Sequence, residues 1–397
     1  MADNRPENTR FGVNQSGLRA YNERLILSLL QVNGAMPGSE IANNTGLSSQ
    51  TASVILRKLE SDGLLTRLDP VRGRVGKPRA PMTLNPDGQF SFGLKIGRRS
   101  SELILLDFCG NIRAQMRSRY AYPMPDPVFA FLRDGIDRIQ AGLSDLQISR
   151  ICGIGIAVPG RLWQWHQQLG APIGDNLAWK GIDFETRIST FSDLPVRIEN
   201  DASAACRAEL LYGHGRAFRD HAYFFLGAFV GGGMVLNNTV FQGHQNNAAA
   251  FGSLPDVTDD GQRRTLLDVA SLHVLESRLR RSGRNPNELW TRPDDWSSFE
   301  PEVSHWQSEA ASALARAALA TCSVVDFQAI IIDGAVPRPV CTQLAEAVRQ
   351  EFGQLDHRGV IPPRIEAGQV GQNARAIGAA SGPLMSQFML NSMSGPG

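Results

Sequence analysis

The hydrophobic pattern of this chain changes its period at the turn cluster Asn85-Pro86-Asp87-Gly88. Before the cluster, apolar residues recur every three or four positions, as in amphipathic helices, whereas after it apolar runs alternate with helical stretches. A chain of 397 residues is long enough to bury at least two cores. The pattern therefore predicts a small helical domain followed by an α/β domain in two lobes, with a ligand site between the lobes.

The composition excludes several classes of protein. Apolar residues make up 42% of the chain and charged residues 20%, and no run approaches the roughly 18 apolar residues of a membrane helix. The polar start MADNRPENTR lacks the apolar stretch of a secretory signal, so we expect a cytoplasmic protein with no membrane partner. The five cysteines form no CxxC pair, which argues against disulfides and against a cysteine zinc site.

Three helices are expected in the N-terminal domain, over about residues 21–31, 39–44 and 49–62. Gly46 supplies a tight turn before the third helix, and Ser48 is well placed as its N-cap. One face of this helix is apolar. The other face carries small hydroxyls, an amide and two cations: Ser49, Gln50, Thr51, Ser53, Arg57 and Lys58. Such groups can read base edges in a major groove, and the cations can contact phosphates.

A basic hairpin follows the third helix. In LLTRLDPVRGRVGKPRAPMTL the apolar ends can pair as strands around a tip with four cations and no acid: Arg72, Arg74, Lys77 and Arg79. Up to Asn85 the chain has 11 Lys and Arg against 7 Asp and Glu, which favours an anionic partner. A helical bundle with a solvated face would explain the helices alone. The basic tip favours a winged helix-turn-helix that binds double-stranded DNA.

The sequence also resembles the ROK family of bacterial sugar kinases and sugar-responsive repressors. The matching stretches are GRVGKPRAPMTLNPDGQFSFGLKIG, GIGIAVPG, NLAWKGIDF, PVRIENDASAACRAE and LGAFVGGGMVL. The resemblance covers about residues 18–380, and the winged helix resembles the repressor branch. It implies an actin-like, hexokinase-like (ribonuclease H-like) domain with two lobes around a cleft.

These observations give the expected domain organisation. A flexible N-terminus over residues 1–17 precedes a winged helix-turn-helix over 18–85, a ROK domain over 86–382 and a loose tail over 383–397.

The resemblance indicates that groups needed by a kinase have been replaced. Family kinases have an aspartate in the first phosphate-binding hairpin and a small glycine-threonine turn after it. Here Lys95 stands at the aspartate position and Arg98-Arg99 at the turn, while Phe229 adds bulk to the second phosphate motif. Phosphoryl transfer requires charge stabilisation around a metal, and a lysine cannot hold magnesium. We therefore expect no enzymatic activity and no cofactor.

Five residues are expected to bind the ligand: Asn176, Asn200, Asp201, Gln245 and Asp268. By resemblance, Asp201 matches the catalytic base of the kinases, and Asn200 matches the neighbouring sugar ligand. Both residues are also good helix caps, and the two roles can coexist. Asn176 matches a loop close to the sugar, and Asp268 stands for a glutamate of the family. Gln245 belongs to the polar stretch QGHQNN.

Other family features are missing or open to two interpretations. The EIGH turn of the family aligns with residues 250–253, which removes a glutamate and a histidine, so no metal site is expected. Trp163 and Trp165 could stack on a sugar ring, but a core or subunit contact is the favoured interpretation.

We therefore expect a sequence-specific DNA-binding transcriptional regulator, a repressor of carbohydrate metabolism or uptake genes. Its inactive ROK domain would bind a sugar or sugar derivative, and symmetric operators imply a homodimer or homotetramer. Two alternatives stay open. The chain could be a sugar kinase with an attached DNA-binding domain, or a regulator controlled by a protein partner with the cleft empty.

Overall fold

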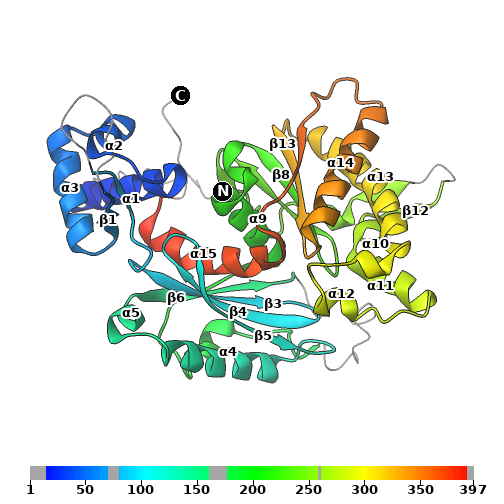
Figure 1. The fold of residues 1–397 in the computed structure, drawn as a ribbon, viewed down its shortest axis with the longest axis horizontal. Coiled ribbons are helices and arrows are strands. Elements are labelled where there is room, and N and C mark those ends of the chain that lie inside the picture. The colour runs from blue at the N-terminus through cyan, green and yellow to red at the C-terminus, as the bar shows by residue number, and fades with distance from the viewer. Residues whose placement is uncertain (1–14, 70–79, 161–176, 258–260, 391–397) are drawn as a thin grey trace, which may run out of the picture. The chain divides into compact units, whose positions relative to one another are not determined.

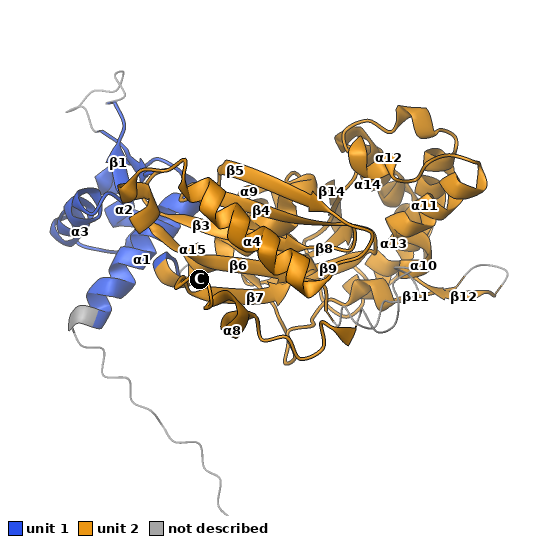
Figure 2. Cartoon of the chain, turned by 90° about the horizontal axis from the view of Figure 1, so that it is seen from below, with its two compact units in different colours: residues 1–85, 388–390 blue, residues 86–387, 391–397 orange. Residues whose placement is uncertain are grey.

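The computed structural model describes residues 15–69, 80–160, 177–257 and 261–390 (Figure 1). The chain divides into two compact units, which Figure 2 shows in different colours. Unit 1 comprises residues 1–85 together with 388–390, and unit 2 comprises 86–387 and 391–397.

Unit 1 contains three helices and an antiparallel pair of strands: α1 (Gln15–Asn33), α2 (Gly38–Thr45), α3 (Ser49–Ser61), β1 (Leu65–Arg67) and β2 (Met82–Leu84). Its core includes Ile26, Ile41 and Leu59, each at most 1% exposed. As predicted, Ser48 caps α3, because its Oγ accepts a hydrogen bond from the Thr51 N–H at 3.1 Å. Three helices followed by a hairpin confirm the winged helix-turn-helix. The tip that carries the four wing cations lies outside the described residues.

A segment near the end of the sequence completes unit 1. Residues 388–390 belong to this unit, and the Leu390 N–H donates a hydrogen bond of 2.9 Å to the Ser28 hydroxyl on α1. The Met389 side chain is only 3% exposed. The first unit is therefore built from two parts of the sequence that lie far apart.

Unit 2 contains two lobes, each built on a five-stranded sheet. The first lobe has the strand order β5-β4-β3-β6-β7. Its elements are β3 (Phe90–Ile96), β4 (Ser100–Asp107), β5 (Ile112–Arg119), α4 (Pro125–Gln140), α5 (Asp145–Ser149), β6 (Ile151–Val158), α8 (Phe184–Ile188) and β7 (Val196–Asn200). Helix α4 packs on this sheet through Val128, Phe129 and Leu132.

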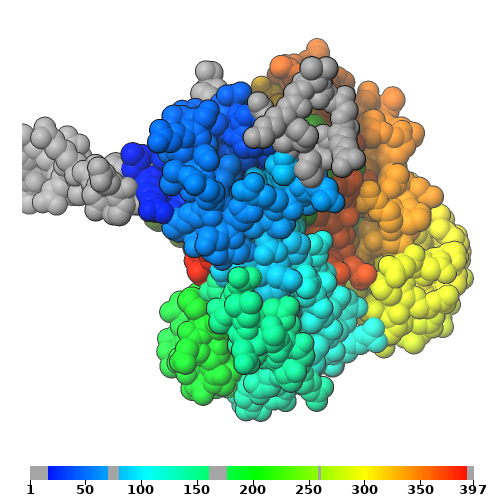
Figure 3. Space-filling view, turned by 60° about the vertical axis from the view of Figure 1, so that its left-hand side comes forward, coloured from blue at the N-terminus to red at the C-terminus, as the bar shows by residue number. Residues whose placement is uncertain are grey.

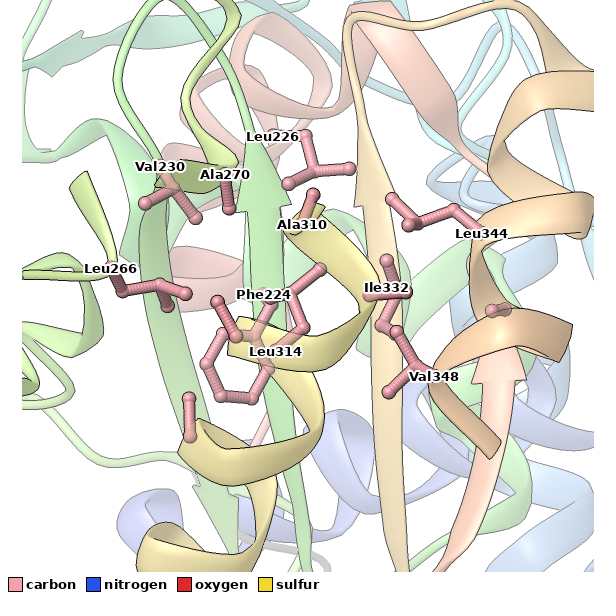
Figure 4. Packing of buried hydrophobic residues seen from close by; sticks show 14 of the residues in the cluster. Phe224, Leu226, Val230, Leu266, Ala270, Ala310, Leu314, Ile332, Leu344 and Val348 are labelled. Atoms are coloured by element: carbon pink, nitrogen blue, oxygen red, sulfur yellow. The ribbon is translucent and has the colours of Figure 1, made fainter. Parts of the chain in front are cut away.

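The second lobe repeats the arrangement with the order β10-β9-β8-β13-β14. Its strands are β8 (His221–Leu226), β9 (Gly231–Leu236), β10 (Thr239–Val240), β13 (Ala329–Gly334) and β14 (Arg364–Ala367), with a separate pair β11 (Pro255–Val257) and β12 (Arg263–Thr265). Its helices are α10 (Leu267–Ala270), α11 (Leu272–Arg281), α12 (Glu288–Thr291), α13 (Glu302–Cys322) and α14 (Arg338–Gln354). Figure 4 shows Phe224 and Ile332 of the sheet beside Ala310 and Leu314 of α13. In both sheets antiparallel strands precede parallel ones, which agrees with the predicted two-lobed fold.

Two helices rich in small residues pack backbone to backbone within unit 2: α9 (Asp201–Tyr212) and α15 (Ala374–Phe388). A Cβ added to Gly378 of α15 would lie 1.7 Å from the Ala204 carbonyl oxygen of α9. A Cβ on Gly155 of β6 would lie 1.8 Å from the Ala379 carbonyl oxygen. Only glycine permits these approaches, so α15 lies tightly against both α9 and the first sheet.

Two features of the helices depart from the sequence pattern. Apolar residues recur at helical spacing over residues 266–280, but the structure divides this stretch into α10 and α11 at Ser271, whose hydroxyl accepts a hydrogen bond from the Val230 N–H at 2.9 Å. Residues 383–388, which were expected to belong to a loose tail, instead form the end of α15, which continues through Pro383 to Phe388.

Candidate functional site

The exposed face of α3 carries the residues expected to contact DNA. Ser49, Gln50, Thr51, Ser53 and Arg57 are all exposed, and Figure 3 shows α3 at the surface of unit 1, which is blue in that view. The opposite side of the helix buries Ala52, Ile55, Leu56 and Leu59. Burial of one face therefore fixes which polar side chains point to solvent.

The two cations of α3 differ in their surroundings. Arg57 donates to the Ser53 carbonyl of its own helix at 3.3 Å. Lys58 is half-buried and forms ion pairs with Asp62 at 2.7 Å and Glu23 at 3.4 Å. These carboxylates raise the pKa of Lys58, the hydrogen bond to Asp62 being the main cause. Lys58 therefore has two carboxylate partners within the protein, whereas the contact given for Arg57 is with a backbone carbonyl.

A cleft of about 1000 Å³ runs through unit 2 and is lined by residues from both lobes. Of the predicted ligand residues, Asn200, Asp201 and Gln245 line it. Asp268 is not among the lining residues; its carboxylate accepts hydrogen bonds from the N–H and hydroxyl of Thr265 at 2.8 Å, which fixes the start of α10. Asn176 and the tryptophans 163 and 165 lie outside the described residues.

Of the two neighbouring residues Asn200 and Asp201, only Asn200 caps the helix that follows. The Asn200 side chain caps α9 by accepting hydrogen bonds from the N–H groups of Ala202 at 2.9 Å and Ser203 at 3.3 Å. The Asp201 carboxylate instead forms an ion pair with Arg375 at 3.3 Å. Both side chains also line the cleft, so the cap and the cleft surface share the same turn between β7 and α9.

Lys95 lies on the cleft surface of β3, where it is 7% exposed. Its Nζ donates to the Ser100 hydroxyl at 3.1 Å, and its neighbour on β4 is Glu102. Burial, reinforced by the nearby charge of Arg375, lowers the pKa of Lys95 to about 7. Glu102 forms a 2.8 Å hydrogen bond with Arg117; burial alone would raise the pKa of this carboxyl, but Lys95 and Arg117 lower it.

Arginines of the turn between β3 and β4 reach the second lobe. The Arg98 guanidinium stacks on the Phe229 ring with its carbon 3.4 Å from the ring centroid, and burial lowers the pKa of Arg98 to about 9. Arg99 forms an ion pair with the buried Glu276 of α11 at 3.2 Å. The bulky turn residues expected from the sequence therefore occupy the space between the two lobes.

The carboxylates that line the cleft have cationic partners. Of the carboxylates that line the cleft, Asp201 pairs with Arg375, Glu102 with Arg117 and Glu199 with Arg207. Magnesium requires oxygen ligands in a regular octahedron, and these carboxylates already serve cationic partners. Among the described residues, no group of three or more His, Cys, Asp or Glu side chains could hold a metal ion.

Several lining residues were not anticipated from the sequence. Arg375 is the most important of them, because its guanidinium contacts Asp201 and lies over the Phe225 ring at 4.7 Å. Asn247 is another: a Cβ on Gly160 would lie 3.5 Å from the Asn200 amide nitrogen and 3.7 Å from the Asn247 amide oxygen. The stretch QGHQNN signalled a polar loop, but the sequence held no signal that Arg375 faces Asp201.

Comparison with known proteins gives two matches to family profiles. The profile described as ROK family matches residues 91–382, and the profile described as winged helix-turn-helix DNA-binding matches residues 19–66. In the part of the chain that the structure describes, no helix is both long and apolar enough to cross a membrane.

Similar proteins include both regulators and kinases. The uncharacterized protein y4fQ of Sinorhizobium fredii is 26% identical over 95% of this chain and 94% of its own length. The xylose repressor of Bacillus spizizenii is 23% identical over 60% of this chain and 62% of the repressor. A crystal structure of a ROK family transcriptional regulator, a homologue of the E. coli MLC protein, has a TM-score of 0.65 at 19% identity, covering 94% and 97% of the two chains. Glucokinases also match.

Proposed function

The chain belongs to the ROK family and has a winged helix-turn-helix at its N-terminus, and we propose that it is a transcriptional repressor controlled by a sugar or sugar derivative. Unit 1 binds operator DNA through α3 and the basic wing, and the cleft of unit 2 binds the effector. The similarity to a xylose repressor supports a sugar effector. In a homodimer of this protein, the two copies of α3 would occupy half-sites about 34–36 Å apart on a symmetric operator.

We further propose that the cleft does not transfer phosphate. The observation that carries this proposal is the cluster of Lys95, Arg98 and Arg375 around Asp201. A general base at Asp201 would need an unpaired carboxylate and a metal-bound phosphate donor. Here Arg375 pairs with the Asp201 carboxylate, and cations line the side of the cleft where the phosphate donor would bind. Asp201 then acts as a hydrogen-bond acceptor for a hydroxyl of the effector.

DNA binding is tested by selecting sequences from a random double-stranded pool with the full-length protein. We expect enrichment of a palindromic site, and Gln50→Ala should weaken binding to that site by about 10-fold or more with an unchanged melting temperature. Binding that shows no sequence preference at any salt concentration contradicts the assignment of unit 1 as an operator reader.

A sugar kinase is the second candidate, because glucokinases match the chain and Asp201 lines the cleft. ADP release is measured with a panel of monosaccharides and Mg-ATP, for the wild type and for Asp201→Asn. We expect no sugar-dependent ADP release. Sugar-dependent ADP release that Asp201→Asn abolishes would establish a kinase. It would refute the proposal of a sensor that lacks catalytic activity.

A further inference from the structure

An apolar side chain stands in the middle of the exposed face of α3. Val54 is 48% exposed, whereas Ile55 and Leu59 of the same helix are at most 4% exposed. With about 100° of rotation per residue, Val54 lies about 40° from Gln50 and about 60° from Arg57 around the helix axis. These three residues lie opposite the buried side of the helix and form one line along it, here called the solvent stripe.

The stability of α3 does not favour a valine at this position. A β-branched side chain loses rotamer freedom in a helix, so an exposed valine favours the helix less than an alanine does. Val54 also keeps about half of its surface in water, and that half gains nothing from burial in unit 1. Single exposed apolar residues are common on proteins, but this one lies among the side chains assigned to contact DNA. Its position therefore points to an apolar contact in the DNA complex.

Two polar residues beside the solvent stripe already have partners within unit 1. The Thr51 hydroxyl lies 2.8 Å from the Ser48 hydroxyl, and the Thr51 N–H donates to the same oxygen, so both groups of Thr51 serve the N-cap. Lys58 is paired with Asp62 and Glu23. The side chains of the solvent stripe are therefore better placed than these two to meet the bases.

The solvent stripe combines an amide with an apolar group one helical turn further on. In a major groove, glutamine pairs best with adenine through N6 and N7, whereas an apolar side chain contacts the 5-methyl group of thymine. Residues four apart in a helix are separated by about 6 Å along its axis, which spans at most about two base pairs of 3.4 Å. An adenine contacted by Gln50 therefore requires the base contacted by Val54 to lie within about two base pairs of it.

We propose that Val54 contacts the 5-methyl group of one thymine in each operator half-site, close to the base that Gln50 contacts. This inference rests on the proposed function, because it assigns a specificity-determining residue to the same DNA-binding unit. Removal of water from the methyl group and from the exposed half of Val54 favours binding. Cytosine offers no methyl group at that position, so Val54 selects thymine without a hydrogen bond.

Replacement of single thymines by deoxyuridine tests the inference without any change to the protein. The probe is the operator selected from the random pool, in which each thymine of one half-site is replaced in turn. Deoxyuridine lacks the 5-methyl group and keeps the hydrogen-bonding groups of thymine. Fluorescence anisotropy with the full-length protein should show one replacement that weakens binding by about 4-fold, the value of one buried CH₂ group. That thymine should lie within about two base pairs of the adenine for which Gln50→Ala loses its preference.

Val54→Ala and Val32→Ala provide the matched variants. Val32 is 42% exposed and belongs to α1 of the same unit. Val54→Ala should bind the thymine operator and the deoxyuridine operator with equal affinity, whereas Val32→Ala should keep the difference of about 4-fold. The melting temperature of Val54→Ala should not fall, because alanine is the better helix former.

The outcomes separate this inference from the proposed function. If the protein selects an operator but no deoxyuridine replacement weakens binding, the inference is wrong and the DNA-binding regulator stands. An undiminished deoxyuridine effect in Val54→Ala assigns the methyl group to another residue and also overturns the inference. A change of oligomeric state in Val54→Ala, measured by sedimentation velocity, would make the solvent stripe a protein contact instead. If no sequence is enriched from the pool, both the inference and the operator-binding function are refuted.

Discussion

At the residue scale, Lys95 should make the stability of the protein depend on pH. Its pKa is about 7 in the folded chain against 10.5 for an exposed lysine, so between these values the unfolded chain binds one more proton. The contribution of Lys95 to the free energy of unfolding should therefore rise with pH by about 1.4 kcal/mol per unit across this window.

The measurement compares denaturant unfolding of the wild type and Lys95→Met from pH 7 to 10. Glu102, Arg117, Asp201 and Arg375 surround this lysine, and the variant leaves all four in place. We expect Lys95→Met to be more stable than the wild type at pH 7 and the difference to shrink toward pH 10. Parallel pH profiles for the two proteins would show that Lys95 is not desolvated as described.

The residues that line the cleft differ in how well the sequence predicts them. Asn200 and Asp201 were predictable, because they stand next to each other between a strand and a helix, in a motif with a recognisable pattern. Arg375 was not, because it comes 174 positions after Asp201 and meets it only through the packing of α15 on α9. Local patterns carry no information about contacts of that range.

At the element scale, the contact of α15 with α9 leaves no space for a methyl group. Gly378→Ala should destabilise unit 2 by about 1–3 kcal/mol or more, because the new Cβ would overlap the Ala204 carbonyl. Gly353→Ala on α14 is the matched control: no atom lies within 4 Å of its added Cβ, and it should stabilise by about 0.5–1 kcal/mol. Melting temperatures that move in the same direction would contradict this packing.

Helix α3 offers a second comparison within one element. Arg57→Ala should weaken DNA binding at every sequence and reduce the slope of log affinity against log salt by about 1, as loss of a phosphate contact does. Lys58→Ala should have a smaller effect, because Asp62 and Glu23 already pair with Lys58. Fluorescence anisotropy over a salt series measures both slopes, and a larger effect of Lys58→Ala would reverse this assignment.

The elements that sequence predicted well are those with a strong hydrophobic period. The apolar runs gave β3, β4, β6 and β13, and the helical period gave α3, since burial imposes these patterns directly. Helix α15 was not predicted. It contains Pro383, and its buried residues other than Pro383 and Leu384 are alanine, glycine and serine, whose small side chains give a weak apolar signal. Its packing depends on close backbone approach, which leaves a weak signal in the sequence.

At the scale of the whole molecule, effector and operator should influence each other equally. If the effector lowers the affinity for the operator by a given factor, the operator must lower the affinity for the effector by the same factor. This is measured by titrating a sugar or sugar derivative that binds the protein in the absence and presence of saturating operator. Unequal factors would indicate a third participant, such as a change of oligomeric state.

The return of residues 388–390 to unit 1 has a consequence for biosynthesis. The hydrogen bond from Leu390 to Ser28 cannot form until residue 390 has been translated, although the helices of unit 1 are made first. At about 5–20 residues per second, the roughly 300 intervening residues take on the order of 15–60 s. A nascent chain therefore carries an unfinished first unit throughout synthesis of unit 2, and the first unit is complete only once residue 390 has been made.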